Sequence, residues 1–162
     1  LNFMGNEIGQ LREWDENRQQ DWDMLGYPMH DSFYHYYREL SGIYTTCPAL
    51  YNGEYNPNCF RWLQVHAAQF STYVYERRAE GQSVIVMLNF SDQYWSSFSF
   101  GYDRNVTLKE LINSDWEEYS GKTKHSDMKV LVQEQVYDGM PYRISTDIAP
   151  FSARIFLVKK GL

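Results

Sequence analysis

Eight short segments in the second part of the chain alternate apolar and polar side chains with a period of two. This period places neighbouring side chains on opposite faces of a β-strand, and each segment has the usual length of a strand. The predicted strands are 60–65, 71–78, 83–90, 94–100, 106–111, 130–136, 142–148 and 151–158. Because polar turns separate them, the eight strands are expected to form an antiparallel β-sandwich.

Three segments refine this prediction. Residues 79–82, Ala-Glu-Gly-Gln, form a short loop with a glycine, which predicts a hairpin between the second and third strands. Residues 84–88 are continuously apolar, as is typical of a central strand covered on both faces. The stretch 113–129 is too polar for a strand and is predicted to be a long exposed loop.

A helix is predicted before the strands. Its apolar side chains recur at helical spacing, at Phe33, Tyr36, Tyr37, Leu40 and Tyr44. Asp31 or Ser32 can cap its start, and Pro48 ends the segment. Gly42 costs about 1 kcal/mol relative to alanine inside a helix, so the helix depends on tertiary packing of its apolar face.

The first residues combine two tryptophans with many charged and amide side chains. Residues 6–22 contain Trp14 and Trp22 within this polar run, which indicates either a surface turn anchored by two core tryptophans or one wall of a polar site. The apolar run 1–4 predicts a short buried strand that Gly5 ends. Because the run begins at Leu1 without a methionine, we expect a fragment of a longer protein.

Charge and composition argue against several classes of partner. The formal net charge is −6 and no basic cluster exceeds two residues, so nucleic acid is not an expected partner. No apolar stretch approaches the roughly 20 residues of a membrane span, so we expect a cytoplasmic protein without a membrane partner. Neither a metal, a disulfide nor a cofactor is expected, because the cysteines and histidines have no ligand spacing: Cys47, Cys59, His30, His35, His66 and His125.

The motif Met4-Gly5-Asn6-Glu7-Ile8-Gly9-Gln10, followed by Glu13-Trp14 and Asp21-Trp22, resembles the end of the catalytic barrel of 1,4-α-glucan (glycogen) branching enzymes, members of the α-amylase superfamily. The resemblance continues in order over essentially the whole chain, through Pro48-Ala49-Leu50, Phe60-Arg61-Trp62, Asn89-Phe90-Ser91 and the segment 111–115. The chain departs from the family at 91–97 and at Ala149-Pro150, where proline-rich sequences are usual. Both departures lie in the predicted sandwich.

This resemblance implies a mainly β fragment with two parts. Residues 1–50 would be the eighth strand, an active-site loop and the eighth helix of a truncated (β/α)8 barrel. Residues 51–162 would be the C-terminal antiparallel β-sandwich. The parent enzyme would hold a cut α-1,4-glucan as an ester on an aspartate and pass it to a 6-hydroxyl, retaining the anomeric configuration. Its catalytic carboxylates would lie upstream, so this chain has no catalytic residue and should be inactive alone.

The resemblance also implies roles for residues of the 6–22 loop, which would form one rim of the active-site cleft. Glu7 and Gln10 would bond hydroxyls of the α-glucan, and Trp14 would stack on a glucose ring. The residues that would support the loop are Glu13, Asp21 and Trp22. Two alternatives remain open, because Glu7 can equally tie loops together and either tryptophan can be a core anchor.

Two other functions remain open beside the branching transferase. A non-catalytic glucan-binding sandwich would need an exposed row of aromatic side chains on one face. A related debranching or trehalose-forming hydrolase is a second alternative, against which the Glu13-Trp14 and Asp21-Trp22 pairs argue. In a fragment, surface that truncation exposes would also be open to self-association.

Overall fold

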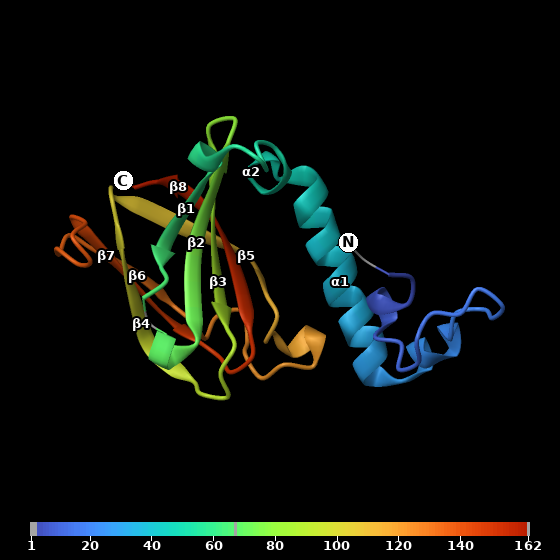
Figure 1. Cartoon of the computed structure of the whole chain (residues 1–162). Helices are drawn as coiled ribbons and strands as arrows, with labels where there is room; N and C mark the ends of the chain where they lie inside the picture. Colours follow the sequence, from blue (N-terminus) through green and yellow to red (C-terminus); the bar gives the residue numbers. More distant parts are fainter. Residues whose placement is uncertain (1–2, 67, 162) are drawn as a thin grey trace.

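Two β-sheets and a helical layer make up the computed structural model, which describes residues 3–66 and 68–161 (Figure 1). The helices are α1 (Pro28–Thr46) and α2 (Pro48–Tyr51). The strands are β1 (Phe60–Gln64), β2 (Thr72–Ala79), β3 (Gln82–Asn89), β4 (Trp95–Tyr102), β5 (Val106–Asn113), β6 (Val130–Gln133), β7 (Tyr142–Ile148) and β8 (Ala153–Lys160). The short 3-10 turns are η1 (Asn6–Ile8), η2 (Trp22–Gly26), η3 (Pro57–Cys59), η4 (Ala68–Phe70) and η5 (Glu117–Tyr119).

All eight predicted strands are confirmed, and each begins within two residues of its predicted start. A five-stranded sheet in the order β1-β2-β3-β8-β5 packs on a three-stranded sheet in the order β4-β7-β6. Every strand pairing is antiparallel, so the predicted mainly β sandwich is correct. The predicted sixth strand is too long, because β6 ends at Gln133 and Val136 is exposed beyond it.

The predicted hairpin and central strand are also confirmed. Ala79 pairs with Gln82, so the turn consists of Glu80 and Gly81, which both have positive φ values. Two consecutive residues with positive φ match the right-handed twist of the flanking strands, and glycine adopts this conformation without strain. Strand β3 lies in the middle of the five-stranded sheet, and its residues 84–87 are buried.

A buried arginine joins the two sheets. Arg154 on β8 is fully buried, and its Nε donates to Glu110 Oε1 on β5 at 2.6 Å. Its Nη1 donates across the sandwich to Thr146 Oγ1 on β7 at 2.7 Å and to the carbonyl of Asp147. A buried charge is tolerated only when it is paired and hydrogen-bonded, so this network fixes how the sheets face one another.

A second buried carboxylate makes a similar connection from β2. Glu76 is fully buried, pairs with Arg61 on β1 at 2.8 Å, and accepts a 2.7 Å hydrogen bond from the hydroxyl of Tyr102 on β4. Burial, and then the hydrogen bond to Glu76, raise the pKa of Tyr102. The hydroxyl therefore stays protonated and keeps donating to the carboxylate.

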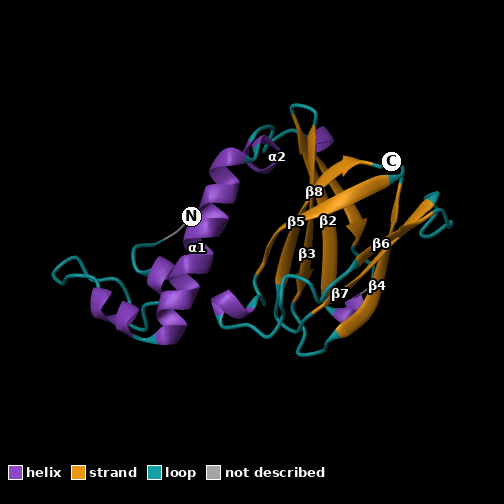
Figure 2. Ribbon diagram, turned by 180° about the vertical axis from the view of Figure 1, so that it is seen from behind, coloured by secondary structure: helices purple, strands orange, loops and turns teal. Residues whose placement is uncertain are grey.

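Helix α1 covers part of the outer face of the five-stranded sheet (Figures 1 and 2). Its side chains Tyr36, Leu40 and Ile43 pack against a second buried cluster, formed by Cys47, Ala49, Val84, Val86, Ile112, Trp116 and Ile155. The predicted apolar helix face is therefore confirmed only in part, since Phe33 and Tyr44 on it are exposed. A helix between two layers distributes its apolar side chains over more than one face.

The predicted start of this helix is wrong. Helix α1 begins at Pro28, and neither Asp31 nor Ser32 caps it, because the N-cap position is Tyr27. Proline suits the first helical position, since its fixed φ is helical and no backbone N–H is needed there. The predicted end is correct, because the helix stops at Thr46, before Pro48.

The long segment 113–129 is less exposed than predicted. Trp116 within it is buried and stacks on the His125 ring at 3.7 Å. The hydroxyl of Tyr119 donates to Glu39 of α1 at 2.9 Å, and burial followed by this contact raises the pKa of Tyr119. The prediction of an exposed loop rested on the polar composition of the segment. One buried tryptophan and a few contacts with the helix are enough to order the loop against α1.

We expect Arg154→Met to lower the free energy of unfolding by about 3–5 kcal/mol, because the change leaves Glu110 without its cation in a mostly buried position. Urea unfolding of the purified chain measures this loss. Lys159→Met is the matched control, since Lys159 is exposed on the same strand and should change stability by less than about 0.5 kcal/mol. Equal losses in the two variants would contradict the bridging role of Arg154.

Candidate functional site

Residues 3–27 fold over the side of α1 that faces away from the sandwich (Figure 2). Two buried side chains, Ile8 and Met24, anchor this head segment. A ring nitrogen of His30 on α1 lies 2.8 Å from the carbonyl oxygen of Ile8. The turn around Ile8 is flanked by Gly5 and Gly9, which both have positive φ values that a side chain would strain.

The short buried strand predicted at 1–4 is not found in the described part. Leu1 and Asn2 lie outside the described residues, whereas Phe3 and Met4 form no strand and are exposed. A strand needs a neighbouring strand to satisfy its backbone groups, and in the described ranges none lies beside this segment. A sequence pattern that is typical of a β-strand does not show whether the neighbouring strand that it would pair with is present.

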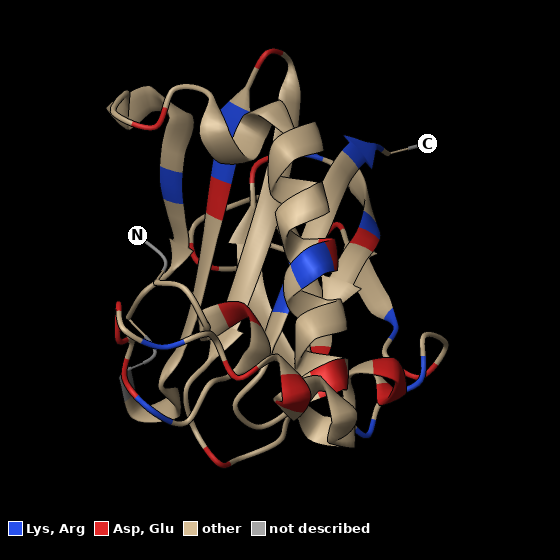
Figure 3. Ribbon diagram, turned by 90° about the vertical axis from the view of Figure 1, so that its right-hand side faces the viewer, with Lys and Arg blue, Asp and Glu red and all other residues tan. Residues whose placement is uncertain are grey.

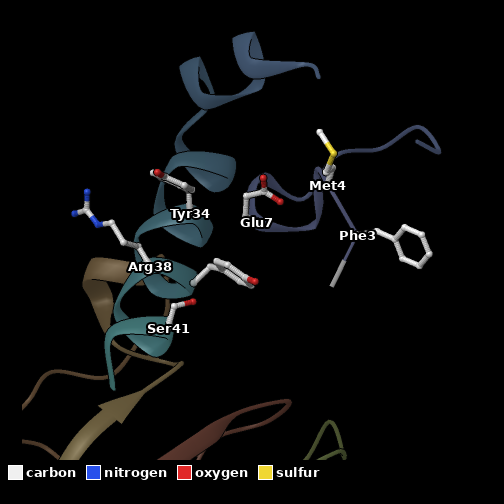
Figure 4. Close-up of a pocket in the computed structure, with 7 residues that line it drawn as sticks. Phe3, Met4, Glu7, Tyr34, Arg38 and Ser41 are labelled. Carbon is white, nitrogen blue, oxygen red and sulfur yellow. The ribbon is translucent and has the colours of Figure 1, made fainter. Parts of the chain in front are cut away.

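A first groove lies between the head segment and α1 (Figure 4). It has a volume of about 430 Å³ and is lined by Phe3, Met4, Glu7, Tyr34, Tyr37, Arg38 and Ser41. In Figure 4, Glu7 lies between the helix and the segment of Met4, whereas the Phe3 ring points away from the helix. Glu7 Oε2 accepts a hydrogen bond from the backbone N–H of Gly5 at 2.9 Å.

A second groove of about 410 Å³ adjoins the first and shares Phe3 and Met4 with it. Its other lining residues are Gly5, Asn6, Gln10, Arg12, Glu13 and Trp14. The fold therefore brings Gln10, Glu13 and Trp14 together, while Glu7 lies in the neighbouring groove. Trp14 is 48% exposed, so a large part of its indole is open to solvent.

Gln10 already makes contacts that shape the loop. Its Oε1 accepts from the backbone N–H of Asp21 at 3.1 Å, and its Nε2 donates to the carbonyl of Arg12 at 3.2 Å. A primary amide has two donors and two lone pairs on its oxygen, so Gln10 keeps one donor and one acceptor for a ligand. Its geometry allows loop support and ligand binding at the same time.

Sequence reasoning missed Arg12. Arg12 Nε donates to Asp21 Oδ2 at 2.8 Å, and Arg12 Nη2 donates to the carbonyl of Gln19, so the side chain closes the loop across its base. The only available signal was one arginine beside several acidic residues, which does not identify the partner. The pair is partly exposed, so its energetic contribution is modest and its role is to order residues 11–20.

Among the described residues, neither Trp22 nor Glu13 has a side-chain hydrogen bond or ion pair like that of Arg12 that would define a role. Trp22 begins the η2 turn and is 44% exposed, so it is not the buried core anchor that one alternative assumed. Trp14 is not a buried anchor either. Glu13 is exposed at the rim of the second groove. The supporting roles expected of Glu13 and Trp22 stay predictions.

The surroundings of these grooves are acidic. In Figure 3, Asp and Glu gather around the lower end of α1 and the turns beside it, whereas Lys and Arg are dispersed over the fold. Within residues 3–66 and 68–161, no group of three or more His, Cys, Asp or Glu side chains could hold a metal ion. None of the helices in those ranges is long and apolar enough to cross a membrane. Such a site suits a neutral polar ligand better than a polyanion.

Comparison with known proteins gives a family match and a set of longer relatives. Residues 62–159 match the family described as alpha amylase, C-terminal all-beta domain. The 1,4-alpha-glucan branching enzyme GlgB of Geobacillus stearothermophilus is 33% identical in an alignment of 164 positions that covers 99% of this chain and 26% of that protein. GlgB of Oceanobacillus iheyensis is 27% identical over 98% of this chain and 25% of its own length. The chain thus spans about a quarter of these curated relatives.

Solved structures share the fold at low sequence identity. An Anoxybacillus alpha-amylase matches with a TM-score of 0.51 and 14% identity, over 80% of this chain and 23% of that chain. A mutant of MutB, from crystals soaked with trehalulose, matches with a TM-score of 0.51 and 22% identity, over 85% and 20% of the two chains. These likenesses show the fold alone.

Arg12→Met is expected to speed proteolytic cleavage within residues 11–20 severalfold, because the base of the loop loses its ion pair and the contact to Gln19. The free energy of unfolding should fall by no more than about 1 kcal/mol, as for other partly exposed pairs. Timed digestion with mass mapping measures the cleavage. Arg18→Met is the control, since Arg18 is largely exposed with its nearest carboxylate oxygen 3.8 Å away. Identical cleavage rates in both variants would refute the role of Arg12.

Proposed function

The chain belongs to the family of the alpha-amylase C-terminal all-beta domain, and we propose that it is the C-terminal part of a 1,4-α-glucan branching enzyme. The sequence relatives whose match covers nearly the whole chain carry this name. The parent enzyme would transfer an α-1,4-glucan segment to a 6-hydroxyl and so form the α-1,6 branches of glycogen. The identity of these relatives supports a branching transferase over a debranching or trehalose-forming hydrolase.

We propose that residues 1–50 are the end of the catalytic barrel and that residues 51–162 are the sandwich. The position of α1 supports this division, because the helix packs on the sandwich with one side and carries the head segment on the other (Figure 1). In (β/α)8 enzymes the loops after the strands form the active site, and the helices form the outer ring. The head segment would then be a rim of the cleft.

The observation that carries the proposal for the site is the groove that joins Gln10, Glu13 and an exposed Trp14. Sugar hydroxyls need directional partners, which amides and carboxylates provide, while the C–H face of a glucose ring packs on an aromatic plane. In the proposed enzyme Gln10 and Trp14 would bind the α-glucan, and Glu7 would contribute from the adjoining groove. Glu13, Asp21 and Trp22 would hold the loop.

The parent would work by two displacements that retain the anomeric configuration, with an aspartate nucleophile, a general acid and a third carboxylate. These groups must converge from several barrel strands, and we propose that they belong to the part of the enzyme that precedes this chain. A cytoplasmic location and a reaction without a cofactor stay predictions.

A glucan-binding sandwich without catalytic partners is the remaining alternative. It requires an exposed aromatic row on one face, and such a row does exist on β1 and β2. Phe60 and Tyr75 stack at 29°, whereas Trp62 meets both rings nearly at right angles, at 88° and 80°, so only part of the row offers the flat face that a sugar needs. The alternative is therefore less well supported than the cleft rim.

The 162-residue chain alone is expected to leave amylose unchanged, because it would lack the carboxylates of both displacements. Iodine staining after incubation with the purified chain measures this, with a buffer control and a full-length branching enzyme for comparison. Loss of staining above the buffer control would refute the proposal that catalysis resides elsewhere.

In the full-length enzyme, Trp14→Ala is expected to lower kcat/KM for amylose by several-fold to tenfold, as the loss of a stacking contact of about 1 kcal/mol predicts. The melting temperature should stay near that of the unchanged enzyme, because Trp14 is half exposed. Tyr55→Ala is the control, since Tyr55 is 95% exposed, lies outside the head segment and lines neither groove. Normal kinetics in Trp14→Ala would contradict the cleft-rim role.

A further inference from the structure

A third groove lies in the sandwich itself, where the edge strand β1 of one sheet meets the edge strand β4 of the other. We call it the sandwich groove. It has a volume of about 230 Å³. Strand β4 lies across the sandwich from α1 (Figures 1 and 2), so this groove is remote from the two grooves of the head segment. Its polar lining residues are Gln64, Ser96, Ser97, Ser99, Tyr137 and Arg143.

The backbone of β4 departs from regular strand geometry at this groove. The register between β4 and β7 shifts between Trp95 and Phe98, as in a β-bulge, which redirects side chains. Ser97 within the shift has a φ of 52°, which is uncommon for serine. Its backbone N–H donates to Asp147 Oδ1 at 2.7 Å, and this contact holds the conformation. Strained backbone of this kind occurs most often at binding sites.

Arg143 on β7 supplies the positive charge of the groove. Its Nε and Nη2 donate to Ser99 Oγ at 3.0 and 2.9 Å, and its guanidinium lies 5.2 Å from the centre of the Tyr137 ring. Its Nη1 has only a contact of 3.5 Å with Gln135 Oε1. No carboxylate oxygen in residues 3–66 and 68–161 lies within ion-pair distance of Arg143. The cation is therefore fixed in place without a counter-charge from this part of the chain.

The groove keeps several hydrogen-bond donors free for a ligand. A guanidinium has five N–H groups, and the side-on contact with Ser99 occupies one on Nε and one on Nη2. The end-on pair of N–H groups, one on each terminal nitrogen, can still bind two oxygens of one anion. Ser96 and Ser97 are exposed, and their hydroxyls have no hydrogen-bond partner among the residues that the structure describes. They add two further donors.

The aromatic rings of the groove favour an anion over a neutral sugar. Phe70 meets Trp95 edge to face, with ring centroids 4.8 Å apart, and Trp95 Nε1 donates to the carbonyl of Phe70 at 3.2 Å. The Tyr137 ring is already in contact with the Arg143 guanidinium. A sugar would need an open ring face for stacking. Because these rings are engaged with neighbouring side chains, the charged and hydroxyl donors are the main contacts that the groove offers.

Two carboxylates near the groove hold its walls and do not line it. Asp138 Oδ2 accepts from Gln64 Nε2 at 3.3 Å. The oxygens of Asp147 accept from the backbone N–H of Ser97 and from the Tyr94 hydroxyl. Both carboxylates oppose the approach of an anion from a distance. Binding is therefore expected to depend on direct contact with Arg143 and not on long-range attraction.

We propose that the sandwich groove binds a phosphate monoester of a small polar molecule. A phosphoryl group has three terminal oxygens, of which Arg143 would bind two while Ser96 and Ser97 donate to the third. The groove is smaller than the pockets of drug-sized ligands, so a ligand of the size of a hexose phosphate fits it best. Residues 91–97 are also one of the two segments at which the sequence departs from that of branching enzymes. The proposal is independent of the proposed function, because no residue of the head segment takes part.

Titration calorimetry of the purified 162-residue chain with glucose 6-phosphate tests the proposal. We expect saturable binding with a dissociation constant on the order of 1 mM or lower, and inorganic phosphate should compete. Glucose and gluconate are the matched ligands, since glucose lacks the anion and gluconate carries a carboxylate with one oxygen fewer. Glucose should not bind, and gluconate should bind several-fold more weakly.

Three outcomes of this titration would overturn the proposal. Glucose 6-phosphate that does not saturate the chain would show that the groove holds no phosphate ester. Equal binding of glucose would identify a neutral sugar site. Binding of gluconate that equals or exceeds that of glucose 6-phosphate would identify a carboxylate site.

Variants of the groove locate the binding. Arg143→Gln should weaken glucose 6-phosphate binding by about tenfold or more, since a charge-assisted pair of hydrogen bonds is lost. Arg143→Lys keeps the charge without the paired donors, so its binding should be intermediate. Arg18→Gln is the control, because it removes the same charge at an exposed position outside the groove and should leave binding unchanged.

Ser96→Ala keeps the test decisive if loss of the contact between Arg143 and Ser99 unfolds the chain. Ser96 is exposed and its hydroxyl bonds no described residue, so urea unfolding of Ser96→Ala should match that of the unchanged chain. Its binding of glucose 6-phosphate should be weaker by about threefold to tenfold, as for the loss of one hydrogen bond. Undiminished binding in Ser96→Ala, or in a folded Arg143→Gln variant, would place the ligand elsewhere and overturn the proposal.

Discussion

The outer face of the five-stranded sheet is apolar across its width, and its need for cover determines where the other elements lie. Helix α1 satisfies this need over β3, β8 and β5, and the segment 113–129 closes the side of the helix through Trp116 and Tyr119. Because α1 is held in this way, its far side can carry the head segment with the two grooves. The candidate site is thus positioned by a sheet that contributes no residue to it.

The sequence predicted the sandwich well because strand periodicity and burial have the same cause. A period of two appears wherever one face packs on a core, so all eight strands and the hairpin at Glu80 and Gly81 were found. The start of α1, the buried strand as far as Phe3 and Met4, and the exposure of 113–129 were predicted wrongly. The last two features depend on which neighbour is present, and neighbours distant in the sequence leave no local pattern. The start of α1 did have a local signal, since Pro28 suits the first helical position.

The candidate site was predictable in its residue types and not in its connections. The tryptophans and amides of the head segment indicated a polar site, and the structure places Gln10, Glu13 and Trp14 around one groove. The pairing of Arg12 with Asp21 and the double contact of Gln10 depend on how residues 10–21 fold back. Such contacts join residues of a loop whose length and polarity permit many closures.

The topology of the larger sheet has a consequence for how the protein is made. Strand β8 lies between β3 and β5 and carries Arg154, so the chain must be synthesised as far as this strand before either neighbour gains its full set of hydrogen bonds. A ribosome that has released residues up to 150 therefore displays unpaired strand edges of the kind that recruit other chains. Translation speed over the codons of β8, and chaperones that hold such edges, would then govern the yield of folded protein.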